Sequence, residues 1–78
     1  MVNKTDIQEH AEVIGSDGKL VGVVDHLEGE DQIKLAKNAP ESGGKHHLIP
    51  LSWVEKVENN RVVLNKSGDE AERDWTAV

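Results

Sequence analysis

Short apolar runs separated by turn-forming residues follow one another along most of the chain. Within the runs Val, Leu and Ile predominate, and polar residues recur with the period of two that is typical of strands. Six runs show this pattern, and we predict a strand at each: Glu12–Gly15, Leu20–Glu28, Gln32–Lys37, His46–Leu51, Trp53–Val57 and Arg61–Asn65. The segment Leu51–Val57 has a second interpretation, a helical turn capped by Ser52.

The segments between the runs predict how the strands are connected. Asp17-Gly18 and Asn59-Asn60 consist of residues that tolerate positive φ, as tight hairpin turns require. Glu28–Asp31 interrupts the pattern again, and Asn38–Lys45, rich in Pro, Gly and Ser, is the longest loop. Tight reversals favour antiparallel neighbours, and closure of a small sheet protects its edges. We therefore predict a mainly β fold, a small six-stranded antiparallel barrel.

The C-terminal residues change to a helical pattern. Ser67 followed by Glu70 is a capping-box pattern, which predicts a short helix over residues 67–75 with Trp75 covering one end of the barrel. Near the other terminus we expect Ile7 to point inward. Neither end indicates a second domain, so residues 1–78 are interpreted as one domain with its core over about residues 11–68.

The composition makes the core aliphatic. The chain has 78 residues and no Cys, Phe or Tyr, and Trp53 and Trp75 are its only aromatic residues. Disulfides and thiolate metal sites are excluded, and so small a core often gains stability by self-association. The N-terminal residues lack the pattern of a signal peptide, and no apolar run reaches transmembrane length. We therefore expect a cytoplasmic protein that does not engage a membrane.

Two stretches of the chain resemble the PRC-barrel superfamily. They are VIGSDGKLVGVVDHLE and HHLIPLSWVEKVENNRVVLNKS, which together span roughly residues 11–68. The marks within them are Asp17-Gly18 followed by Gly22-Val23-Val24, then IPLSWV and the hairpin VENNRVVLNKS. Among members of that superfamily, the chain is most similar to small stand-alone bacterial proteins of unknown function.

The resemblance implies a compact six-stranded barrel-like domain that acts by docking. Related domains occur in the H subunit of photosynthetic reaction centres and at the C-terminus of a ribosome-maturation factor, where they are docking surfaces and not catalysts. Since a fold does not determine a function, neither specific role is transferred to this chain. Only the general theme of an interaction module is retained.

Our leading hypothesis is a non-enzymatic module for protein interaction or self-association. Every Ser is explained by turn or cap chemistry, nothing resembles a strained nucleophile elbow, and no cofactor is expected. The apolar segments Leu20–Val24 and Leu48–Val57 are the expected contact regions. The candidate contact residues within them are Leu20, Val21, Val23, Val24, Leu48, Ile49 and Trp53.

A first alternative is the binding of RNA or another anion. The net charge of −6 argues against non-specific nucleic-acid binding, because such binding neutralises phosphates. Residues 32–66 nevertheless hold six basic and three acidic residues. The candidate anion-binding residues are Lys34, Lys37, Lys45, Arg61 and Lys66.

A second alternative is a histidine-based metal site formed by His26, His46 and His47. Adjacent residues of a strand point to opposite faces, which hinders His46 and His47 from binding one ion together. The chain also lacks a local ligand pair such as H-x-H or H-x-x-x-H.

Overall fold

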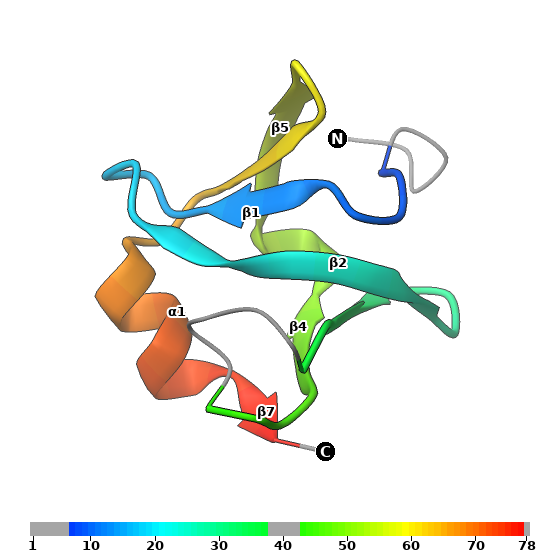
Figure 1. Cartoon of the computed structure of the whole chain (residues 1–78). Helices are drawn as coiled ribbons and strands as arrows, with labels where there is room; N and C mark the ends of the chain where they lie inside the picture. The colour runs from blue at the N-terminus through cyan, green and yellow to red at the C-terminus, as the bar shows by residue number, and fades with distance from the viewer. Residues whose placement is uncertain (1–6, 38–42, 78) are drawn as a thin grey trace.

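The computed structural model describes residues 7–37 and 43–77 (Figure 1). Within these residues the chain is mainly β with one short helix near its C-terminus, as predicted. The elements are β1 (Glu12–Ile14), β2 (Leu20–Glu28), β3 (Gln32–Leu35), β4 (His47–Pro50), the 3-10 turn η3 (Leu51–Trp53), β5 (Val54–Glu58), β6 (Arg61–Leu64), α1 (Gly68–Asp74) and β7 (Thr76–Ala77). The predicted loop Asn38–Lys45 lies partly outside the described residues.

The seven strands of the described ranges form one mixed sheet in the order β5-β6-β1-β2-β3-β4-β7. β1 and β6 are parallel, and the other neighbouring strands are antiparallel. Because β5 and β7 stand at the two ends of this order, the sheet is open. The predicted closed barrel of six antiparallel strands is therefore wrong in strand number, in strand direction and in closure.

The short strand β7 is the additional strand, and it lies at one end of the open sheet. It pairs with β4 through Leu48 opposite Thr76 and His47 opposite Ala77. It thereby occupies the side of β4 that faces away from β3, and β5 remains at the far end of the sheet. The parallel pair arises because the β5–β6 hairpin returns β6 alongside β1 in the same direction.

The long strand β2 joins the two halves of the sheet. Its first half pairs with β1 and its second half with β3. Between these halves Val24 is opposite Leu35 and His26 is opposite Lys34, so that Asp25 is an extra residue, a β-bulge. A bulge bends a strand and increases its twist, which allows one strand to serve both halves.

The predicted hairpin turns are confirmed by their backbone angles. Gly18 has φ of 86°, and Asn59 and Asn60 have φ of 51° and 60°. Both turns therefore use the left-handed region that Gly and Asn tolerate best.

The core is aliphatic and follows the alternation along the strands. Ile7 is 7% exposed, as expected, and packs in the same cluster as the buried strand residues. The other buried apolar residues are Ala11, Val13, Val21, Val24, Ile33, Leu35, Ile49, Val62, Leu64 and Ala71. Gly22 belongs to this packing, because a Cβ there would lie 3.3 Å from Cδ1 of Leu35.

The helix α1 has the predicted capping box. The Ser67 hydroxyl accepts a hydrogen bond from the Glu70 backbone N–H at 3.2 Å, and the Glu70 carboxylate accepts one from the Ser67 backbone N–H at 3.1 Å. Trp75 is the C-terminal cap of the helix. The alternative helical turn is found as η3, but Ser52 does not cap it, because Pro50 occupies the N-cap position without a side-chain hydrogen bond.

Candidate functional site

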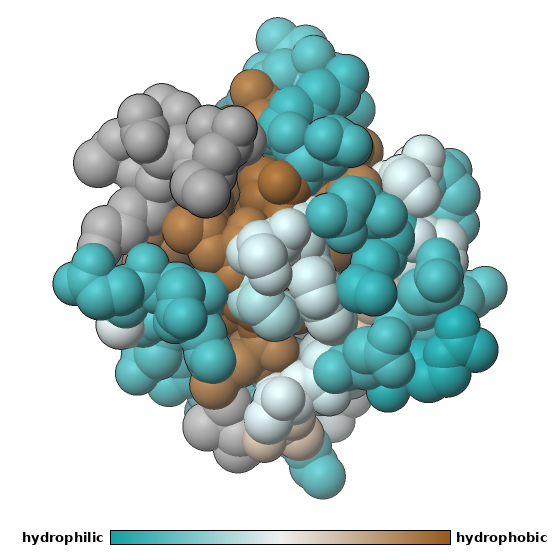
Figure 2. Space-filling view, turned by 180° about the vertical axis from the view of Figure 1, so that it is seen from behind, coloured by the Kyte–Doolittle hydropathy of each residue, from teal (hydrophilic) through white to brown (hydrophobic). Residues whose placement is uncertain are grey.

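Part of the aliphatic surface around the core remains exposed. Four aliphatic side chains pack against the core cluster but are only partly buried: Leu27, Leu51, Val54 and Val57. We call these four residues the apolar opening. The view from behind shows hydrophobic surface between hydrophilic regions (Figure 2).

Three residues of the apolar opening come from one segment, η3 and the edge strand β5. Val54 and Val57 are three residues apart, which does not fit a regular strand of period two. The register shift between Val54 and Lys56 resolves this, because a bulge lets both valines face the core side. The spacing in WVEKV is the sequence signal for this arrangement. All three residues lie in the predicted contact region Leu48–Val57, although none is among the seven candidate contact residues.

A hollow of about 310 Å³ lies beside Leu51. Glu30, Asp31, Leu51 and Ser52 line it, and most of the lining surface is apolar. The Leu51 backbone N–H donates a hydrogen bond to the Asp31 carbonyl at 2.7 Å, which holds η3 against the β2–β3 hairpin. The hollow is therefore mainly apolar, and two of the residues that border it are acidic.

The seven predicted contact residues divide between core and surface. Val21, Val24 and Ile49 are at most 1% exposed and belong to the core, so they offer no surface to a partner. The others keep partial exposure on three elements: Leu20 and Val23 on β2, Leu48 on β4 and Trp53 on η3. The two apolar segments singled out in the sequence thus contribute alternate residues to the outside.

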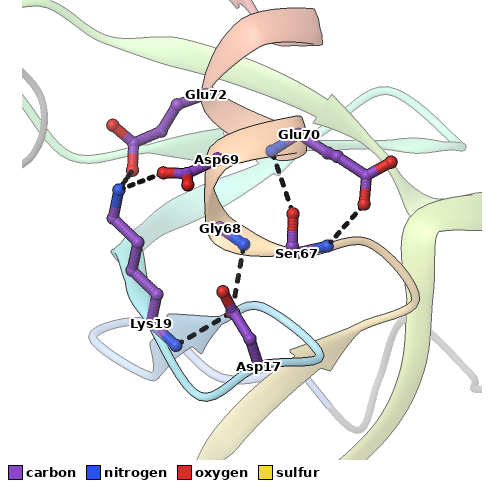
Figure 3. Close-up of polar contacts among 7 residues, drawn as sticks. All are labelled: Asp17, Lys19, Ser67, Gly68, Asp69, Glu70 and Glu72. Carbon is purple, nitrogen blue, oxygen red and sulfur yellow. Dashed lines mark hydrogen bonds and ion pairs between the residues drawn. The ribbon is translucent and has the colours of Figure 1, made fainter.

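A polar network connects the β1–β2 turn to the start of α1 (Figure 3). Asp17 Oδ1 accepts hydrogen bonds from the backbone N–H groups of Lys19 and Gly68, each at 3.1 Å, and these bonds lower the pKa of Asp17. Lys19 Nζ lies 2.6 Å from Asp69 and 3.2 Å from Glu72, and the hydrogen bond to Asp69 is the main reason that the pKa of Lys19 is raised.

The network holds the helix close to the β1–β2 turn. A Cβ on Gly15 would clash with the backbone N of Gly68, and a Cβ on Gly68 would lie 2.7 Å from the Lys19 side chain. The turn and the helix were each predicted from the sequence, but their contact was not, because residues about fifty positions apart give no local signal.

Two of the candidate metal ligands meet at the β2 bulge. Asp25 Oδ2 lies 3.2 Å from His26 Nδ1 and 3.9 Å from His46 Nδ1. His26 Nε2 lies 2.7 Å from Glu28, and His46 Nδ1 lies 3.0 Å from the Leu35 carbonyl oxygen. The rings therefore have polar partners in the protein, and no His, Asp and Glu side chains in residues 7–37 and 43–77 form a group of three suited to a metal ion.

His47 is separate from these two histidines. It begins β4 and stacks on Trp75 with ring centroids 3.8 Å apart, whereas His46, at which the strand was predicted to start, precedes β4. Burial lowers the pKa of His47, and Lys45 lowers it further, whereas Glu72 raises it. His47 Nδ1 is buried without a hydrogen-bond partner among the described residues.

The candidate anion-binding residues are distributed over several elements. Lys34 lies on β3, Lys37 and Lys45 lie in the segments between β3 and β4, and Arg61 and Lys66 stand at the start of β6 and just beyond its end. Arg61 is paired with Glu12 at 3.1 Å, and Lys66 lies 4.0 Å from Asp74 and 5.1 Å from the centre of the Trp53 ring. These acidic neighbours reduce the positive potential that an anion would meet.

The part of the chain that the structure describes contains no helix long and apolar enough to cross a membrane. The predicted cytoplasmic location stays a prediction.

Comparison with known proteins places the chain in a family without assigning an activity. No curated protein matches it. Residues 7–72, which include every element except β7 and the end of α1, match the family described as an uncharacterized protein conserved in bacteria, DUF2171. The match covers well over half of the chain, and the protein therefore belongs to this DUF2171 family of uncharacterized bacterial proteins.

Proposed function

We propose that this protein is a non-enzymatic interaction module that docks a segment of a partner protein at the apolar opening. The observation that carries the proposal is the partial exposure of Leu27, Leu51, Val54 and Val57, which pack against the core of an open sheet. Burial of apolar surface by a partner gains about 25 cal/mol per Å². An edge strand with apolar side chains is also the usual place where an extended segment adds to a sheet.

The charges around the opening favour a partner of one kind. Glu30 and Asp31 line the hollow, and Glu55 is exposed on β5. Aliphatic side chains flanked by Lys or Arg would match this surface in both polarity and charge. We therefore expect the partner segment to be apolar and basic.

The resemblance to PRC-barrel domains supports the same proposal by analogy. Those domains act as docking surfaces, and a mainly β domain with an accessible apolar side is suited to the same use. RNA or anion binding and metal binding remain alternatives, but no observation on the described residues favours either above docking.

The proposal is tested by photo-crosslinking in bacterial cells. We expect a photoreactive amino acid at position Ser52, beside the hollow, to form adducts with a partner protein, and the same group at Arg73 on α1 to form none. Equal adducts at both positions, or none at either, would refute docking at the apolar opening.

A second experiment tests the chemistry of the partner. A short peptide of alternating Leu and Lys should bind, as measured by calorimetry, and the same peptide with Glu in place of Lys should not. Binding should weaken in the double variant Glu30→Lys/Asp31→Lys and with added salt, but not in the control Asp74→Lys. If the affinity for the peptide does not change in the double variant, the expectation of a basic partner segment is contradicted.

A further inference from the structure

The parallel strands β1 and β6 present a second surface, on the outer face of the sheet. They are in register, with Glu12 beside Arg61 and Ile14 beside Val63. The residues between these pairs, Val13 and Val62, are 0% exposed and point into the core. Since side chains alternate along a strand, the other four must point outward.

The four outward residues form two short rows across the strand pair. One row is charged. It consists of Glu12 and Arg61, and Arg61 Nε donates a hydrogen bond to Glu12 Oε1 at 3.1 Å. The other row is aliphatic, because Ile14 and Val63 are both partly exposed. The flanking strands differ from one another. On one side, β2 places Val23 opposite Glu12 and Leu20 opposite Ile14. On the other side, β5 places Glu58 opposite Arg61 and Lys56 opposite Val63. In Figure 1, β1 and β2 lie in front of β4 and β5.

This arrangement is complementary to itself. Consider a two-fold axis that runs above the face, parallel to β1 and β6 and midway between them. Rotation about this axis places β6 of a second copy over β1 of the first. It does not change the position of any residue along the strand direction. Glu12 then faces Arg61 of the second copy, and Ile14 faces Val63. For these four residues, charge meets opposite charge and aliphatic meets aliphatic. On the flanking strands, Leu20 and Val23 of one copy lie over Lys56 and Glu58 of the other.

We propose that a second copy of this chain docks on this face, with the sheets packed face to face about that axis. The surface is distinct from the apolar opening, so the proposal does not depend on the function proposed above. Sheets that pack face to face lie about 10 Å apart, a distance across which Arg and Glu side chains meet. An interface of this kind is isologous, as closed homodimers require.

The dimer gains from the rearrangement of its charges. Within one chain Arg61 and Glu12 are 57% and 51% exposed, and a pair so exposed adds little to stability. At the interface two such pairs form a square of alternating charges from which water is partly removed, which strengthens the attraction and fixes the orientation. The aliphatic row is small, so the dimer belongs to the class that dissociates on dilution.

The test uses charge reversal in two chains. Sedimentation velocity of the wild type from micromolar to millimolar concentration should show a rise from monomer to dimer mass. Glu12→Arg alone and Arg61→Glu alone should each remain monomeric, since each brings four like charges together. An equimolar mixture of the two single variants should again form dimers, because every contact across the axis is then between opposite charges.

The mixture of variants distinguishes a direct effect of the substitutions on the interface from an indirect effect through the fold. Each single variant has lost its own Glu12–Arg61 pair, so only contacts between chains can explain a dimer in the mixture. Circular dichroism should show that both variants melt close to the wild type. Arg73→Glu on α1 and Leu51→Asp in the apolar opening serve as controls and should dimerise as the wild type does. A wild type that stays monomeric at millimolar concentration, or a mixture that stays monomeric, would overturn the proposal.

Discussion

The imidazole ring of His47 stacks on the indole ring of Trp75, with the centroids 3.8 Å apart and the planes inclined by 16°. His47 lies on β4 and is 7% exposed, and Trp75 directly precedes β7, the strand that pairs with β4. The stack therefore fastens the C-terminal segment to the sheet. It also makes that attachment depend on a group that titrates near neutral pH.

We expect the free energy of unfolding to decrease as the pH falls below the ordinary pKa of His, 6.5. Burial lowers the pKa of His47 in the folded chain, and the nearby Lys45 and His46 act in the same direction, while Glu72 opposes them. The unfolded chain therefore takes up its proton first, so stability is complete above 6.5 and is lost as the pH falls through the lowered pKa.

Melting temperatures from about pH 8 to about pH 5 measure this effect, since His titrates within that window. The variant His47→Phe should show a flatter dependence on pH than the wild type. His26→Gln, which changes an exposed ring, should retain the dependence of the wild type. If His47→Phe retains it too, the attribution to His47 is wrong.

The stacking itself predicts an interaction energy. In a double-mutant cycle of His47→Ala and Trp75→Ala, we expect the two losses to be non-additive by about 1 kcal/mol, as for other stacked aromatic pairs. Urea unfolding followed by circular dichroism gives the four free energies. Additive losses would show that the rings are neighbours without mutual stabilisation.

A glycine contact predicts a large effect from one methyl group. The Gly15→Ala variant places its Cβ against the backbone N of Gly68, which cannot move without displacing α1. We expect a loss of about 2 to 3 kcal/mol in the free energy of unfolding, at the upper end of the usual cost of overpacking.

Gly22→Ala is the matched control for this prediction. The nearest atom to its Cβ is Cδ1 of Leu35 at 3.3 Å, the end of a side chain that can shift. The gain in strand propensity of Ala over Gly offsets this contact, so the change should stay within about 0.5 kcal/mol. Chemical denaturation of both variants decides the matter, and similar losses would mean that the Gly15–Gly68 approach is looser than described.

The local features of this fold could be predicted from the sequence because local residues produce them. Asn59 and Asn60 make their own turn, and Ser67 and Glu70 cap α1 across three residues. β7 escaped prediction because two residues carry no period, and its pairing with β4 adds a seventh strand at one end of the sheet.

The candidate surfaces depend on register, which the sequence does not display. Glu12 and Arg61 become neighbours only because β1 and β6 are parallel, whereas tight turns had favoured an antiparallel barrel. Likewise, Val54 and Val57 share a side of β5 only because a bulge lies between them. The apolar segment Leu20–Val24 was found, but its division into core and surface residues required the structure.

The tie between the β1–β2 turn and α1 predicts an order of effects for two neighbouring residues. Asp17 accepts hydrogen bonds from the backbone N–H groups of Lys19 and Gly68. Replacement of Asp17 by Ala removes both of these hydrogen bonds. Lys19 makes ion pairs with the exposed Asp69 and with the partly buried Glu72, and because Lys19 itself is 42% exposed, we expect these pairs to contribute less. We therefore expect Asp17→Ala to lower the melting temperature more than Lys19→Ala does.

The same hydrogen bonds make the contribution of Asp17 to the stability of the fold depend on pH. They lower the pKa of Asp17 below its ordinary value of 3.8, so its contribution is present above that value and is lost as the pH falls through the lowered pKa. Melting curves at neutral pH should thus separate wild type, Asp17→Ala and Lys19→Ala, and the difference between wild type and Asp17→Ala should shrink in strong acid. Equal melting temperatures for the two variants at neutral pH would show that the backbone donors of the turn and the helix do not depend on Asp17.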